Sequence, residues 1–125
     1  MKNSNWSLGP RPYDLRERLF LFACLIVRVV QFLHTRGPIA VALSYQILKS
    51  GTSAGANYEE ADDGSSAKDT LAKRMIALRE LKETHFRLRV LRHGGLLLPE
   101  QDPVIDENDQ LIRIVATLVR KGRKP

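Results

Sequence analysis

The sequence predicts an all-α protein built as an antiparallel up-and-down four-helix bundle. Apolar residues recur at helical spacing through most of the chain, and no run alternates with the period of two that a β-strand requires. Clusters of Gly, Pro, Asp and Ser divide the chain into four helical segments with short connections. Short connections make neighbouring helices run antiparallel, which gives the up-down-up-down order.

The first two helices are bounded by clear start and stop signals. The first is expected to begin at Tyr13 or Asp14, because an aspartate side chain caps a helix N-terminus well, and to end near His34. The second is expected to begin at Pro38, since proline suits the first turn of a helix, and to end near Ala61.

The last two helices are bounded in the same way. Ser66 is a good N-cap for the third, which is expected to cover 67–93 and to stop at the following glycine pair. The fourth is expected to open at Asp102 or at Asp106 and to end near Lys121. The chain then has three parts: an N-terminal extension (1–12), the bundle (13–121) and a basic C-terminal tail (122–125).

Length and composition limit the function classes. The chain has 125 residues and a formal net charge of +6, which fits one domain and permits, without requiring, an acidic partner. Its single cysteine, Cys24, excludes an intramolecular disulfide and a metal cluster built on cysteines. Residues 1–12 lack a signal-peptide pattern, and the apolar stretch 19–33 is too short, and too interrupted by Arg28, to span a membrane. We therefore expect a cytoplasmic protein with no membrane partner.

The first helix carries more apolar residues than one side of a bundle buries. A stripe from Leu15 to Leu33 has the spacing of a core-facing surface. The remaining apolar residues allow two interpretations: a wide core surface within one bundle or, as we favour, an interface between subunits. The predicted oligomer-interface residues are Phe20, Leu21, Cys24, Leu25 and Val27.

The third helix is strongly basic. It has eight Lys and Arg residues against three Asp and Glu, and four more cations lie near the C-terminal end of the chain. Such a helix is either a solvated, charge-laced face or a surface for phosphate groups, because arginine pairs with phosphate oxygens through two N–H groups. The candidate nucleic-acid-binding residues are Arg79, Arg87, Arg89, Arg92, Arg120, Lys121, Arg123 and Lys124.

Small residues dominate the second half of the second helix. Gly51 and Gly55 lie four residues apart, and each costs about 1 kcal/mol of helix stability relative to alanine. We therefore expect a close approach to a neighbouring helix or to another subunit. The segment is not a phosphate-binding loop, because it lacks a Gly-Lys-Ser/Thr ending and a preceding strand.

Two polar residues follow the glycines at one-turn spacing. We expect Asn57 and Glu60 to be buried and hydrogen-bonded to the third helix, since buried polar groups find partners. Lys73 or Arg74 is the expected ionic partner of Glu60.

The residue patterns offer little support for catalysis or metal binding. A di-iron bundle needs Glu-x-x-His on two helices, but Glu83 and His85 are two residues apart and the fourth helix has no histidine. A ribonuclease interpretation uses an Arg-x(4–6)-His pattern such as Arg79 with His85, yet these two residues lie on different sides of a helix. We therefore predict no enzyme activity, no cofactor and no metal site.

Two stretches of the sequence carry a family resemblance. They are YQILKSGTSAGANYEEA at 45–61 and ALRELKETHF at 77–86, and together they resemble the small bacterial four helix bundle protein family. That family includes the proteins encoded in intervening sequences of 23S ribosomal RNA genes, and it often has Trp where this chain has Phe86. Its motif maps onto Ser50, Gly51, Ser53, Gly55, Asn57, Glu60, Glu80 and Glu83.

The resemblance implies an up-and-down bundle that is often assembled as a ring-like homopentamer, and it implies no catalytic activity. Related bundles include the accessory protein of diversity-generating retroelements, a basic pentamer that binds nucleic acid and a reverse transcriptase. A reverse transcriptase or another RNA-associated protein is therefore an expected partner, beside further copies of the chain itself.

The sequence thus predicts a non-enzymatic, homo-oligomeric bundle that binds structured RNA or DNA through basic surfaces, as accessory to an RNA-processing or reverse-transcribing partner. The alternative is a structural or adaptor protein, a homo-oligomeric ring that binds another protein and no nucleic acid. A ribonuclease that depends on His85 is a third hypothesis.

Overall fold

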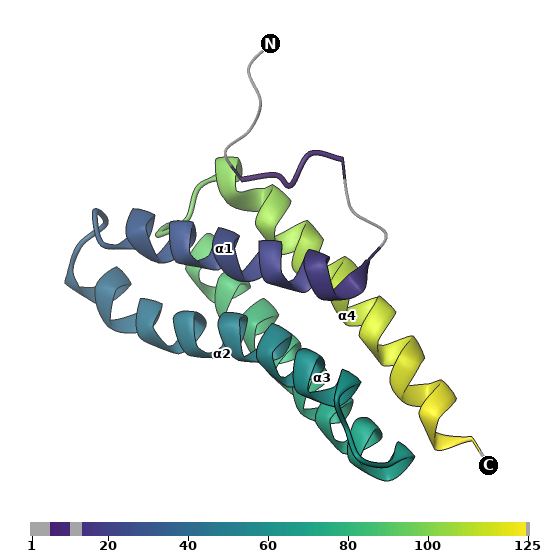
Figure 1. The fold of residues 1–125 in the computed structure, drawn as a ribbon. Helices are drawn as coiled ribbons and strands as arrows, with labels where there is room; N and C mark the ends of the chain where they lie inside the picture. The colour runs from purple at the N-terminus through teal and green to yellow at the C-terminus, as the bar shows by residue number, and fades with distance from the viewer. Residues whose placement is uncertain (1–5, 11–13, 125) are drawn as a thin grey trace.

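The computed structural model describes residues 6–10 and 14–124 of the chain. A short 3-10 turn, η1, leads into the last of four long helices (Figure 1). The bounds are α1 (Leu15–Leu33), α2 (Pro38–Asp62), α3 (Ala67–His93), η1 (Pro99–Gln101) and α4 (Asp102–Arg123). The described residues contain no strand, and the predicted all-α fold with four helices is confirmed.

Two predicted N-caps are confirmed. The Asp14 carboxylate accepts a hydrogen bond from the backbone N–H of Arg16 at 3.0 Å, and the Ser66 hydroxyl accepts one from the N–H of Asp69 at 3.1 Å. Both bonds satisfy N–H groups that a helix N-terminus leaves without an intrahelical partner. Tyr13, the other predicted start of the first helix, lies outside the described residues.

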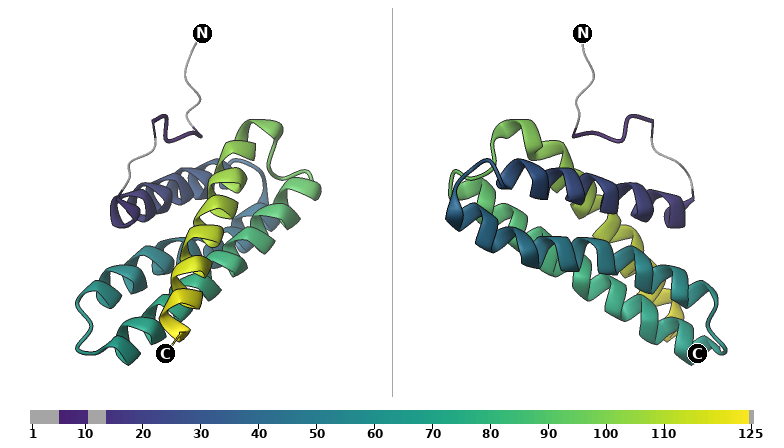
Figure 2. Two further views of the ribbon diagram at one scale, coloured as in Figure 1. Left: turned by 90° about the vertical axis from the view of Figure 1, so that its right-hand side faces the viewer. Right: turned by 60° about the vertical axis from the view of Figure 1, so that its left-hand side comes forward.

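Helices that follow one another in the chain pack side by side. α2 and α3 form a long hairpin, α1 packs along α2, and α4 packs along α3 (Figure 2). α1 and α4 meet over a shorter contact, because they cross at an angle near the N-terminal end of α1 (Figure 1). α3 is therefore supported along both of its flanks, by α2 on one side and by α4 on the other.

All four helices contribute side chains to one core. Fully buried members include Phe22 and Ile26 of α1, Ile47 of α2, Leu81 of α3 and Leu111 of α4. The core-facing stripe that the sequence predicts for the first helix is part of this cluster.

The small residues of α2 pack against α1. A methyl group added at Gly51 would lie 2.7 Å from Cγ1 of the buried Ile26, so a larger residue requires that side chain to move. A methyl group at Gly55 would lie at an ordinary contact distance, 3.5 Å, from Cβ of Leu19. The predicted close approach of two helices is confirmed, and the neighbour is a helix of the same chain.

A buried ion pair joins α1 to α4 where they cross. The Arg18 guanidinium donates to both carboxylate oxygens of Glu107, at 2.7 and 3.0 Å, and to the side-chain oxygen of Gln110 at 3.0 Å. The Arg18 and Glu107 side chains are 12% and 3% exposed. The hydrogen bond with Glu107 raises the pKa of Arg18, against the opposing effect of burial.

The described part of the N-terminal extension lies against α1. The Trp6 ring packs edge-on against Phe32, with the ring centroids 5.9 Å apart. Leu8 is partly buried and shares a small hollow with Leu21 and Cys24. Among the described residues, no helix is both long enough and apolar enough to cross a membrane.

Candidate functional site

Exposed apolar residues and cations share the side of α3 that faces away from the core. This side, the α3 outer face, comprises Met75, Arg79, Lys82, Phe86 and Val90, spaced three or four residues apart so that they stack on one side of a helix. All five are exposed. Large apolar side chains rarely gather on the surface of a helix without a partner, which makes this face the strongest candidate for a binding surface.

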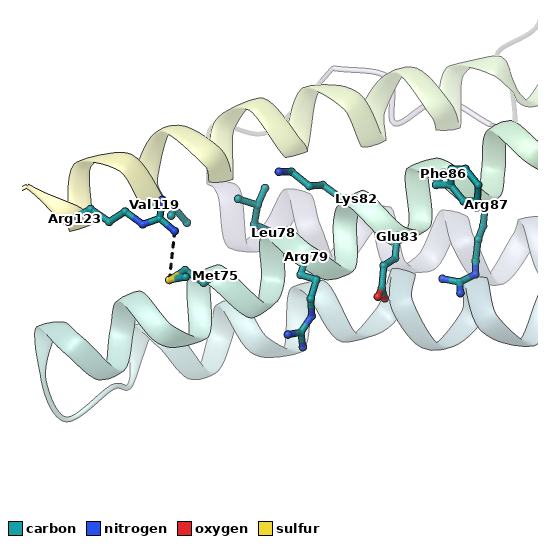
Figure 3. Close-up of a pocket in the computed structure, with 9 residues that line it drawn as sticks. All are labelled: Met75, Leu78, Arg79, Lys82, Glu83, Phe86, Arg87, Val119 and Arg123. Atoms are coloured by element: carbon teal, nitrogen blue, oxygen red, sulfur yellow. Dashed lines mark hydrogen bonds between the residues drawn. The ribbon is translucent and has the colours of Figure 1, made fainter.

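A groove of about 520 Å³ runs between the α3 outer face and α4 (Figure 3). Its walls combine apolar side chains, including Met75 and Phe86, with four cations and one carboxylate. The charged residues are Arg79, Lys82, Glu83, Arg87 and Arg123. The excess of positive charge suits an anionic occupant.

One cation crosses from α4 to α3. Arg123 extends its guanidinium to the thioether of Met75, with a distance of 4.0 Å from Nη2 to Sδ (Figure 3). α4 therefore closes one end of the groove with a charged group. Helix α4 continues beyond its predicted end near Lys121, and this extension brings Arg123 into the site.

A second hollow, of about 200 Å³, lies on the opposite flank of α3, toward α2. It shares Phe86 and Arg87 with the groove, so the Phe86 ring forms a ridge between the two spaces. The Nε–H of Arg87 donates to the side-chain oxygen of Gln46 at 2.9 Å, which holds the guanidinium beside this ridge.

The structure separates the predicted nucleic-acid-binding residues into three places. Arg79, Arg87 and Arg123 meet at the groove. Arg92 lies near the other end of α3, where its Nε is 2.8 Å from Asp102. Arg89 and Arg92 line a separate hollow there. The remaining three, on the last turn of α4 and just beyond it, are exposed to solvent: Arg120, Lys121 and Lys124.

Sequence reasoning did not place Met75, Lys82 and Phe86 in the site. The signal for the two apolar members is the recurrence of apolar residues on the charged side of α3, at 75, 86 and 90.

The family-motif residues mainly build the bundle. Ser50 and Thr84 join α2 to α3 through a buried hydrogen bond of 2.7 Å between their hydroxyls. Thr84 also donates to the carbonyl oxygen of Glu80 at 2.8 Å. Because a hydroxyl has one proton, Ser50 is the donor in the bond between the helices. Glu83 lines the groove.

The expectations for Asn57 and Glu60 need correction. The Asn57 amide donates to the backbone and side-chain oxygens of Ser53, one turn earlier in α2, and makes no described hydrogen bond to α3. Glu60 is exposed rather than buried, because it lies where α2 approaches its end. Its predicted partner Lys73 is confirmed at 2.8 Å, whereas Arg74 lies over the Tyr58 ring.

The predicted subunit interface on α1 is divided by the fold. Phe20 and Val27 are 54% and 42% exposed, and Cys24 is exposed between them, so these three form an apolar surface stripe. Leu25 is buried in the core of the bundle, which makes it unavailable to a second subunit, contrary to the prediction. Leu21 is half-buried beside the N-terminal segment.

The two residues considered for catalysis, His85 and Arg79, lie in different environments. His85 is half-buried, and burial lowers its pKa, partly offset by the nearby Asp109 carboxylate. Arg79 is exposed on the α3 outer face instead. Within residues 6–10 and 14–124, no three His, Cys, Asp or Glu side chains are grouped so that they would hold a metal ion.

Comparison with known proteins supports the family resemblance. No family model matches the chain, and no curated protein matches it. Among solved structures, the chain is similar to a protein of unknown function from the S23 ribosomal protein family of Bacteroides thetaiotaomicron. The two are 29% identical, the match covers 86% of this chain and 99% of that chain, and the TM-score is 0.79. The resemblance predicted from the sequence is thus confirmed.

Proposed function

We propose that this chain, which shares the fold of an S23 ribosomal protein family member, is a non-enzymatic cytoplasmic protein that binds structured nucleic acid, with RNA as the favoured partner. The observation that carries the proposal is the groove beside the α3 outer face, where four cations surround exposed apolar groups and one carboxylate. The structural neighbour belongs to a family named for a ribosomal protein, which supports RNA over DNA.

Binding through these cations is expected to be governed by phosphate contacts. Arginine and lysine side chains that pair with phosphates release condensed counterions, so the affinity falls steeply as the salt concentration rises. Such contacts position a nucleic acid without reading its sequence. The accessory role beside a reverse transcriptase or an RNA-processing protein belongs to the same proposal and is tested by co-purification from the native host.

The test is fluorescence anisotropy with an RNA hairpin across a salt series. We expect a linear fall of log affinity with log salt in the wild type, and a slope smaller by about two to three in the triple variant Arg79→Gln, Lys82→Gln, Arg123→Gln. Arg113→Gln is the matched control, because Arg113 is an exposed arginine of α4 that does not line the groove. No binding at low salt, or equal slopes in wild type and triple variant, contradicts the proposal.

Self-association is the second part of the proposal. The apolar stripe of Phe20, Cys24 and Val27 is uncharged and exposed, as a surface that packs against another copy requires. The resemblance favours five copies, which would together carry a net charge of about +30 and concentrate polyanions around the assembly.

Light scattering measures this directly. The wild type is expected to have a mass several times the 14.2 kDa of one chain, and Val27→Glu is expected to reduce it by placing a charge in the buried contact. A wild-type monomer refutes self-association. An oligomer that binds no RNA at low salt favours the adaptor function instead.

A further inference from the structure

Phe86 is unusually placed for an aromatic residue. Phe86 is 59% exposed, yet it lies within the C-terminal half of α3, the helix with support on both flanks. Hollows lie on both of its sides, the larger toward α4 and the smaller toward α2. A flat apolar group therefore has room beside the Phe86 ring.

Cations lie along α3 on the same surface as this ring. Lys82 precedes Phe86 by about one helical turn, Arg79 by about two, and Arg87 follows it directly. The hydrogen bond from Arg87 to Gln46 fixes one of these guanidinium groups before any ligand arrives. A ligand that matches the site combines a flat apolar part with at least two negative charges a few ångströms away.

An unpaired nucleotide within an RNA strand has this chemistry. We propose that the groove binds such a nucleotide, with its base stacked on the Phe86 ring and a flanking phosphate paired with Lys82. Phosphates farther along the same strand then reach Arg79 and, at the Met75 end of the groove, Arg123. This inference rests on the proposed function and deepens it, because it names the kind of RNA that the site selects. A base held in a duplex is stacked on its neighbours and cannot reach the ring, whereas phosphates of a duplex still reach the cations.

The experiment compares two RNAs of equal phosphate number, one single-stranded and one a blunt duplex, by anisotropy at one salt concentration. Phe86→Ala is expected to weaken binding of the single strand by about fivefold or more, and binding of the duplex by less than about twofold. Phe86→Trp is expected to retain the preference, because its ring also stacks. Phe86→Leu is expected to lose it, because leucine keeps apolar area without a ring face.

Tyr45→Ala is the matched control. Tyr45 is 58% exposed, as Phe86 is, but it lies on α2 beside His34 and lines neither hollow. Its removal should leave the affinity for both RNAs unchanged.

The outcomes separate this inference from the proposed function. If the wild type binds both RNAs alike and Phe86→Ala changes neither affinity, the inference is overturned and the proposed function stands. If the wild type binds neither RNA, both fail. If Phe86→Ala lowers the mass measured by light scattering, Phe86 belongs to a contact between subunits and the inference is again overturned.

Discussion

α1 is held in the bundle by two contacts of different kinds, one with α2 and one with α4. Its contact with α2 is an extended one, in which Gly51 and Gly55 let the two helices approach closely along the apolar side of α1. Its contact with α4 is short and is joined by one buried ion pair, Arg18 with Glu107. The first contact depends on shape and the second on charge.

The packing of α3 differs from that of α1, and this explains why the candidate site lies on α3. α3 packs along a neighbour on both flanks, so its outward side chains project from a rigid support. Binding groups are positioned most precisely on elements whose own position is fixed by packing. The stripe of α1 is better suited to another copy of the chain, for which the exact direction of single charges matters less.

The largest expected effect comes from breaking the charge-based contact between α1 and α4. Glu107→Ala leaves the Arg18 guanidinium, 12% exposed, without its carboxylate and should lower the free energy of unfolding by about 3 kcal/mol. Chemical denaturation measures this change. The double variant Arg18→Met, Glu107→Leu should recover most of the loss, because it removes both charges together. A loss below about 1 kcal/mol in the single variant would show that the pair does not hold the crossing.

An intermediate effect tests the contact based on shape. Gly51→Ala should destabilise the protein by about 1 kcal/mol, because the strain of a methyl group 2.7 Å from Ile26 exceeds the gain in helix propensity. Gly55→Ala is the matched control and should stabilise by up to about 1 kcal/mol, since its methyl group meets Leu19 at an ordinary distance. Equal effects at the two positions would contradict the close approach at Gly51.

The smallest expected effect is the pH dependence of stability that arises from His85 on α3. Burial lowers the pKa of His85 below its ordinary value of 6.5, so the unfolded chain binds a proton there more readily than the folded chain. Stability should therefore fall as the pH drops through 6.5 and below. His85→Gln should show a weaker fall over that window, measured as the shift of the thermal midpoint against pH. Identical pH profiles of the thermal midpoint in wild type and variant would contradict a lowered pKa of His85 in the folded protein.

The sequence predicts features that depend on local patterns. Asp14 and Ser66 follow from the preference of short polar side chains for N-caps, and the close approach at Gly51 follows from the cost of glycine in a helix. The pair between Arg18 and Glu107 has members 89 residues apart, so no local pattern indicates it.

The candidate site was only partly predictable, because local patterns do not show which side chains the fold exposes or brings together. Charge counting finds Arg79 and Arg87, because an excess of cations is visible in the sequence of one helix. It does not find that Phe86 is exposed, since apolar residues of a helix are ordinarily assigned to its core side. Nor does it bring Arg123 to Met75, which depends on how α4 packs along α3.

Ultraviolet cross-linking of a bound single-stranded RNA, with the cross-linked peptides identified by mass spectrometry, tests the central claim most directly. We expect the cross-linked nucleotide on the α3 peptide that contains Phe86, and loss of that cross-link in Phe86→Ala. Cross-links confined to the Phe20 and Val27 stripe of α1, or spread evenly over all cationic peptides, would contradict a binding site on the α3 outer face.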